Sequence, residues 1–145
     1  MKYPGDKATF REIEHTADVG IMVEGNSLSG LFANAAYGMM HLLFGGRKAL
    51  SQVRKKLHLT EPSPEELLIT WLSELNYLVL VENFSLVSVL HLEITRSGKN
   101  YQLTGQIDGG KLSDPEREIK AITYHQFYLK EIRDDHYEAR IIFDI

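Results

Sequence analysis

The sequence has 145 residues, of which 43% are hydrophobic, a composition that predicts one domain over residues 1-145 with an apolar core of its own. It contains no cysteine, which excludes disulfides and thiol catalysis, and its 20 acidic residues against 16 basic ones argue against a protein that coats nucleic acid. Because no stretch resembles a signal peptide or a membrane span, we expect a cytoplasmic protein.

The first third of the sequence predicts a β-hairpin followed by a helix. A short strand over Phe10–Glu14 and an alternating strand that ends at Gly25 flank His15–Asp18, which has the composition of a turn. Ser27 can cap the helix that follows, and Gly45-Gly46 ends it. The apolar residues of this helix recur at helical spacing: Leu28, Leu31, Phe32, Ala35, Met39, Leu42 and Leu43.

The rest of the sequence predicts one more helix and several strands. Alternation from Val53 to Leu59 indicates a strand, and Ser63–Glu66 begins a helix with an N-cap serine, a proline and a capping-box glutamate. Gly109-Gly110 should interrupt the pattern that follows. Period-two segments predict two hairpins, formed by Leu86–Thr95 with Tyr101–Ile107 and by Ile119–Ile132 with Tyr137–Ile145. We therefore predict an α+β fold in two layers, with two helices packed on a mostly antiparallel β-sheet.

The residues best suited to chemistry lie near the two ends of the chain. Asp18 follows the predicted turn, and Asp144 follows the apolar run Ile141–Phe143 directly before Ile145. If the two ends meet, the side chains of Asp18 and Asp144 converge with the terminal carboxylate of Ile145. Like charges at such a distance require a raised pKa or a cation. A divalent cation bound through oxygen ligands resolves the conflict, and calcium, magnesium and manganese suit such ligands.

Each of these residues also has a simpler interpretation. Asp18 can close a turn through its own backbone, and Asp144 can form a salt bridge with Lys120 or Arg140 in place of a metal site. Lys120 stands in an apolar segment, where its ammonium group must reach solvent or find an anion. The residues alone leave the metal site and the salt bridge equally open.

Two histidines are further candidates, and several catalytic motifs are absent from the sequence. His15 and His125 could contact the metal ligands, although a packed, hydrogen-bonded histidine is the commoner role at such positions. No phosphate-cradling glycine motif, G-x-S-x-G elbow or H-E-x-x-H helix is present. Nucleotide hydrolysis and serine-hydrolase activity therefore find no support.

Five segments, taken in order along the chain, resemble the archease family. They are His15–Gly20, Ser27-Leu28 with Leu31–Ala36, Leu72–Leu78, Glu118–His125 and Ala139–Ile145. The resemblance implies an activator of the GTP-dependent tRNA-splicing RNA ligase of the RtcB family, which promotes guanylylation and repeated turnover of the ligase and is not itself an enzyme. It also implies a metal site, described with calcium, at Asp18, Asp144 and Ile145, with Lys120 beside it and implicated in activation.

The expected partner is therefore an RtcB-family tRNA ligase, with RNA contacted only indirectly, no membrane, and a monomer or weak oligomer in solution. Two other functions stay open from the residues alone. One is a small divalent-metal-dependent phosphohydrolase that uses the same carboxylates. The other is a metal-independent adaptor or chaperone, in which Asp18 and Asp144 are structural.

Overall fold

The computed structural model describes residues 10–14 and 18–145 of the chain. Its helices and strands follow the predicted order. They are β1 (Phe10–Glu14), β2 (Asp18–Gly25), α1 (Leu28–Phe44), β3 (Val53–Glu61), α2 (Pro64–Glu82), β4 (Phe84–Ser97), β5 (Asn100–Lys111), β6 (Ala121–Arg133) and β7 (His136–Asp144).

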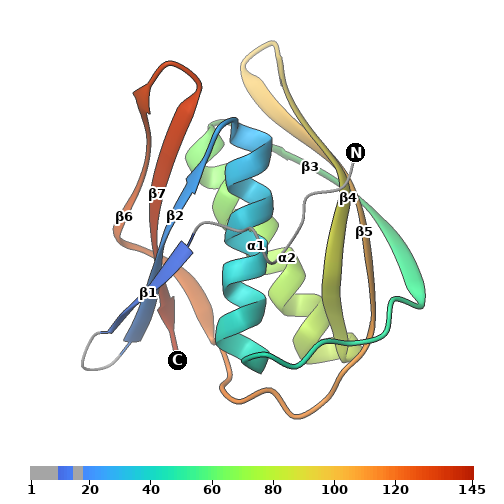
Figure 1. Cartoon of the computed structure of the whole chain (residues 1–145). Coiled ribbons are helices and arrows are strands. Elements are labelled where there is room, and N and C mark those ends of the chain that lie inside the picture. The colour runs from blue at the N-terminus through green and yellow to red at the C-terminus, as the bar shows by residue number, and fades with distance from the viewer. Residues whose placement is uncertain (1–9, 15–17) are drawn as a thin grey trace.

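The strands form two antiparallel sheets, with the orders β1-β2-β7-β6 and β3-β5-β4. Both helices lie between these sheets, and each contacts strands of both, such as β2 and β4 for α1 and β6 and β4 for α2 (Figure 1). The predicted α+β class, with two helices packed on antiparallel strands, is confirmed. The expectation of a single sheet in two layers differs from the structure, because the strands divide into two sheets that enclose the helices.

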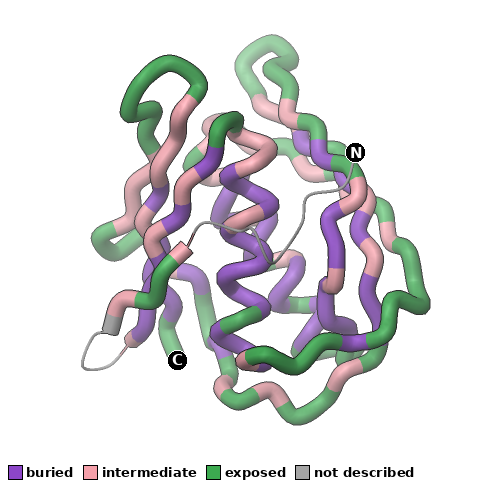
Figure 2. The backbone as a smooth tube through the Cα atoms, viewed as in Figure 1, coloured by how far each residue is buried: buried purple, intermediate pink, exposed green. Residues whose placement is uncertain are grey.

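The burial of the helices explains the second sheet. The consecutive residues Leu67, Leu68 and Ile69 of α2 are all buried, as are Leu42 and Leu43 of α1. A helix that is apolar on most of its sides must be covered on most of its sides, and one sheet covers only one side. Accordingly, buried residues follow both helices and the strands beside them, while the turns of the β4–β5 and β6–β7 hairpins are exposed (Figure 2).

Both helices begin at the serines that the sequence indicates. The Ser27 hydroxyl accepts a hydrogen bond from the Gly30 N–H at 2.9 Å. Ser63 accepts one from the Glu66 N–H at 3.1 Å and donates one to the Glu66 carboxylate at 2.9 Å. Such caps each contribute about 1 kcal/mol to helix stability. Gly45, at a φ of 62°, then ends α1 in a conformation that favours glycine.

The predicted interruption at Gly109-Gly110 is wrong, because β5 continues through both glycines to Lys111. A Cβ atom at Gly109 would clash with the carbonyl oxygen of Ser85, and one at Gly110 would clash with that of Leu50. The two glycines therefore permit the close approach of neighbouring backbone, a use of glycine within strands that does not break them.

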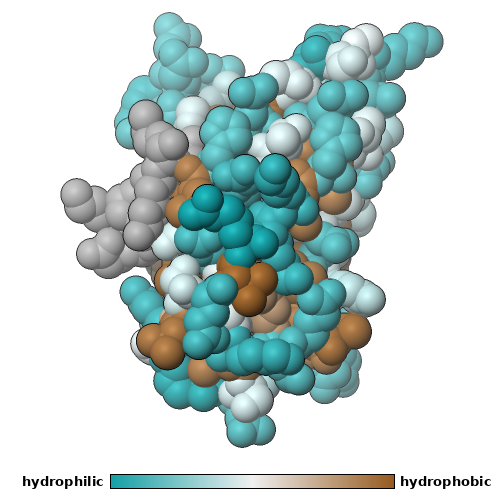
Figure 3. All heavy atoms as spheres, turned by 90° about the vertical axis from the view of Figure 1, so that its right-hand side faces the viewer, coloured by the Kyte–Doolittle hydropathy of each residue, from teal (hydrophilic) through white to brown (hydrophobic). Residues whose placement is uncertain are grey.

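The outer side of the β3-β5-β4 sheet is largely hydrophilic, with hydrophobic groups in scattered places (Figure 3). Within the part of the chain that the structure describes, no helix has the length and apolar character needed to cross a membrane.

Candidate functional site

Strands β2 and β7 bring Asp18 directly opposite Asp144, since the two residues are Cα partners in the antiparallel register. The next pair, Val19 and Phe143, is buried in the core. Because side chains alternate along a strand, Asp18 and Asp144 both lie on the outer face of the sheet, and the Cβ atoms of residues so paired are about 4.5–5.5 Å apart. The structure therefore brings the two chain segments together, as the predicted site requires.

Local packing places this pair at the end of the sheet. Ile142 is 1% exposed although it shares the outer face with Asp144, and its Cα partner is Gly20. A Cβ atom at Gly20 would lie 2.6 Å from Cδ1 of Ile142, so only glycine lets this side chain pack across β2. The carboxylates thus stand beside a buried apolar side chain, at the end of the sheet opposite to the β6–β7 turn (Figure 1).

The carboxylate pair is accessible from one side. The Oδ1 atom of Asp18 is shielded from solvent, whereas Asp144 is exposed and Ile145 is 40% exposed. Carboxylates that face each other across two strands repel, and a cation between them would offset the repulsion. The residue types and their register fit a hard divalent cation, which prefers oxygen ligands.

Among the described residues, no three His, Asp or Glu side chains gather closely enough to hold a metal ion. Asp18 and Asp144 are therefore a pair, and a cation bound there would need further ligands, such as the terminal carboxylate of Ile145 or water. His15, a candidate from the sequence, lies outside the described residues.

Lys120 contacts Asp144 through its backbone. Its N–H donates a hydrogen bond to the carbonyl oxygen of Asp144 at 2.7 Å, and its side chain is exposed. The ion pairs formed between described residues include neither of these two side chains, so the salt bridge that was the alternative to a metal site is not formed. The guanidinium group of Arg140, the other alternative partner, donates to Oε1 of Gln126 at 2.9 Å.

His125 belongs to an irregular part of β6, where residues 124–127 lie opposite Ile141 alone. Its N–H donates to the Thr123 hydroxyl at 3.2 Å, and its side chain is exposed. Within the described chain, no hydrogen bond or ion pair joins its ring to the carboxylate pair. The bulge re-aims the strand locally and leaves His125 facing solvent.

The sequence prediction missed Asn76, which is 5% exposed in the middle of α2. Its Nδ2 atom donates a hydrogen bond to the carbonyl oxygen of Ile119 at 2.8 Å, in the residue directly before Lys120. A signal was present, because Leu72 and Val79 place position 76 on a buried side of the helix, where an amide requires a partner.

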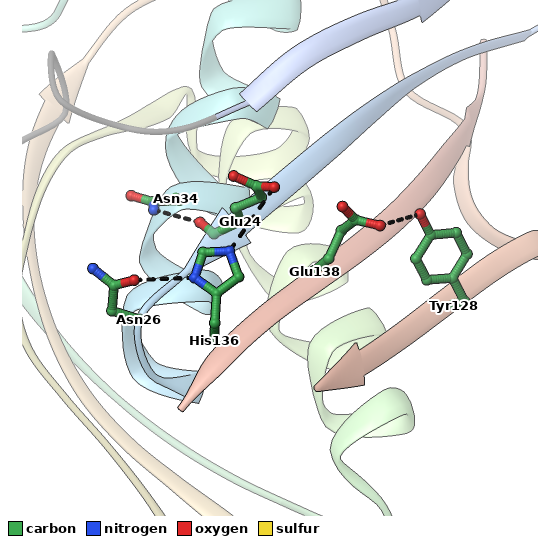
Figure 4. Close-up of polar contacts among 6 residues, drawn as sticks. All are labelled: Glu24, Asn26, Asn34, Tyr128, His136 and Glu138. Atoms are coloured by element: carbon green, nitrogen blue, oxygen red, sulfur yellow. Dashed lines mark hydrogen bonds and ion pairs between the residues drawn. The ribbon is translucent and has the colours of Figure 1, made fainter. Parts of the chain in front are cut away.

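A second polar cluster lies at the other end of the same sheet (Figure 4). The Tyr128 hydroxyl donates to Oε2 of Glu138 at 2.7 Å, and His136 lies 3.1 Å from Oδ1 of Asn26 and 3.9 Å from Oε1 of Glu24. Burial, together with the hydrogen bond to Glu138, raises the pKa of Tyr128 to about 12. Glu24 and Glu138 are Cα partners, about 20 Å along the strands from the aspartate pair, so this cluster is separate from the candidate site.

Comparison with known proteins gives consistent matches over nearly the whole chain. The model of the Archease protein family matches residues 10–145. An archease of Methanosarcina acetivorans is 33% identical over 146 residues, covering 98% of this chain and 99% of the relative. An archease of Pyrococcus furiosus is 30% identical over 140 residues, covering 94% of this chain and 98% of the relative.

Two solved structures share the fold. Protein 1598 of Methanobacterium thermoautotrophicum has a TM-score of 0.77 at 24% identity, covering 94% of this chain and 98% of that chain. A Thermotoga maritima protein, described as an archease and possible chaperone, has a TM-score of 0.56 at 23% identity, covering 92% of this chain and 94% of that one.

Proposed function

Because this chain belongs to the archease family, we propose that it activates the GTP-dependent tRNA-splicing RNA ligase of the RtcB family. In this proposal the protein promotes guanylylation of the ligase and allows repeated turnover, and it carries out no reaction of its own. The observation that supports the proposal is the pairing of Asp18 with Asp144 at an open end of the molecule.

Asp18 and Asp144 would hold a divalent cation together with the terminal carboxylate of Ile145. Calcium, magnesium or manganese would suit these oxygen ligands, and when bound the cation would present positive charge to phosphate oxygens. Asp144 and Ile145 are exposed, so a partner can approach this end of the sheet directly. Lys120 is exposed as well, and because its backbone N–H is bonded to Asp144, its ammonium group would add positive charge at this end of the sheet.

The proposal is tested by measuring turnover of an RtcB-family ligase with the wild-type protein, Asp18→Asn and Asp144→Asn. Both substitutions keep the shape of the side chain and remove its charge, so we expect a folded protein that no longer stimulates the ligase. Asp134→Asn removes an exposed carboxylate at the β6–β7 turn and serves as the control, which should retain full stimulation.

The same variants separate the other functions. Release of phosphate from simple esters by the purified protein alone, lost in Asp18→Asn, would identify a metal-dependent phosphohydrolase. Full stimulation by both aspartate variants in the presence of a chelator would identify a metal-independent adaptor and would contradict the proposal.

A further inference from the structure

The peptide unit between Ile119 and Lys120 is held at both of its polar ends. Its carbonyl oxygen accepts a hydrogen bond from Nδ2 of Asn76 at 2.8 Å. Its N–H donates a hydrogen bond to the carbonyl oxygen of Asp144 at 2.7 Å. A peptide unit is planar and rigid, so these two bonds fix the orientation of the whole plane. One plane therefore connects helix α2 to the end of β7, at the residues that carry the proposed activating groups.

Asn76 is well placed to hold this plane. It is 5% exposed, Ile119 is fully buried, and Leu72 and Val79 on the neighbouring turns of α2 are also buried. A hydrogen bond shielded from water in this way is not exchanged for one with solvent, so the carbonyl group has no alternative donor nearby. The amide thus fixes the chain on the buried side of Lys120, while the ammonium group faces solvent.

Asparagine at this position has two opposing effects on stability. Its Oδ1 atom is buried and has no hydrogen-bond partner among the described residues. A buried, unpaired acceptor costs stability, and leucine would remove that cost while leaving the Ile119 carbonyl without its donor. The two effects oppose each other, so an apolar residue of similar size would change overall stability little.

We propose that Asn76 is a positioning residue that fixes Lys120 and Asp144 relative to each other through the Ile119–Lys120 peptide. The inference rests on the proposed function, in which Lys120 and Asp144 belong to the activating end of the molecule. Without the amide, the peptide plane can turn and the hydrogen bond to the Asp144 carbonyl opens. The ammonium group of Lys120 and the carboxylate of Asp144 are then no longer held in a fixed relative position.

The test uses Asn76→Leu in the full chain. The amide hydrogen of Lys120 should exchange with solvent faster than in the wild type, because its acceptor is no longer held opposite it. Calcium affinity, measured by calorimetric titration of the protein alone, and stimulation of the ligase should each fall about 10- to 100-fold, the usual effect of losing a group that orients metal ligands. The unfolding transition should stay cooperative, at a midpoint close to that of the wild type.

Leu68→Ala, about two turns earlier in α2, is the control. It removes buried apolar volume from the same helix and should lower stability more than Asn76→Leu, yet leave Lys120 exchange and calcium affinity unchanged under conditions where the protein is folded. A merely structural asparagine would instead give losses of function that follow the losses of stability in the two variants.

An Asn76→Leu protein with wild-type Lys120 exchange and wild-type calcium affinity would overturn the inference. If that variant does not fold, Asn76→Ala provides the same test, because alanine favours the helix and has no side-chain group that can donate to Ile119. If the wild-type protein neither binds calcium nor stimulates the ligase, the proposed function fails by itself. The role of Asn76 is then judged by exchange of the Lys120 amide, where faster exchange supports it and unchanged exchange refutes it.

Discussion

Two pairs of acidic residues face each other across β2 and β7, and the side chains that contact them differ. Glu24 is the Cα partner of Glu138 near the β6–β7 turn, as Asp18 is of Asp144 at the opposite end. Glu138 accepts a hydrogen bond from the Tyr128 hydroxyl, and a histidine ring lies 3.9 Å from Glu24. No ion pair between described residues includes the Asp144 side chain.

The same repulsion between facing carboxylates thus arises twice in one pair of strands. At the turn, neutral and basic side chains of the protein relieve it, which makes that end self-sufficient. At the aspartate pair, we propose that a bound cation contributes to this relief, which would make that end responsive to a cation and to a partner. We therefore expect a change at one acidic pair to leave the properties of the other pair unaffected.

The largest expected effect concerns stabilisation by calcium. At a free calcium concentration 100-fold above Kd, binding should stabilise the wild-type protein by about 2.7 kcal/mol, and Asp144→Asn should abolish this gain. Thermal unfolding with and without calcium measures the effect. Glu138→Gln, which alters the other acidic pair, should keep the full calcium-dependent shift. A similar loss in both variants would mean that the two ends are not distinct.

A smaller loss should follow from extending the chain by a few residues after Ile145. The extension converts the terminal carboxylate to a neutral amide and crowds the exposed end, so calcium affinity should fall about tenfold, or about 1.4 kcal/mol. Calorimetric titration measures this change, and the same residues added before Met1 provide the control. Unchanged affinity after the C-terminal extension would remove Ile145 from the proposed ligands.

At the turn, Tyr128→Phe should cost about 1 kcal/mol at neutral pH, because Glu138 loses its hydrogen-bond donor. Burial and this hydrogen bond raise the pKa of Tyr128 from 10.0 to about 12, so the folded state favours the protonated phenol. Its contribution to stability is therefore complete below pH 10 and is lost as the pH rises through about 12. Denaturant unfolding of the wild type and the variant should give curves that converge over this interval, whereas a constant difference would argue against the assignment.

The smallest effect is expected for His136→Gln. The ring is 3.9 Å from Glu24, which is a distant and partly solvated contact, and glutamine can still hydrogen-bond to Asn26. Exposed ion pairs contribute about 0.5 kcal/mol, so the loss in unfolding free energy should not exceed that value. A loss as large as that of Tyr128→Phe would show that the histidine stabilises the glutamate pair as much as the tyrosine does.

Most elements could be predicted because their signals are local. Ser63 with Glu66, the glycine at position 45 and the alternation of apolar residues each act within a few residues of chain, and the structure contains the corresponding caps, helix end and strands. The division into two sheets is not local. It depends on which strands pair across long separations and on helices that are buried on several sides.

The candidate site divides in the same way. Asp144 was identifiable because a charged residue at the end of a buried apolar run is unusual, whereas Asp18 by itself was equally consistent with a turn residue. Only the register of β2 and β7 shows that the two residues meet. Asn76 was not identifiable as part of this region, because its partner is a carbonyl group 43 residues away along the chain. Its helical spacing indicates that the amide is buried and needs a partner, but residue types and spacing do not identify which carbonyl group that partner is.

The strand order has a consequence for the way this chain is made. β7 lies between β2 and β6 but is synthesised after both, so β6 cannot join β2 in one sheet until β7 has been made. Until the ribosome has released that segment, the β1–β2 hairpin exposes an unpaired edge that is open to wrong partners. The four-stranded half of the protein, and with it the aspartate pair, is therefore assembled only after translation has passed Asp144.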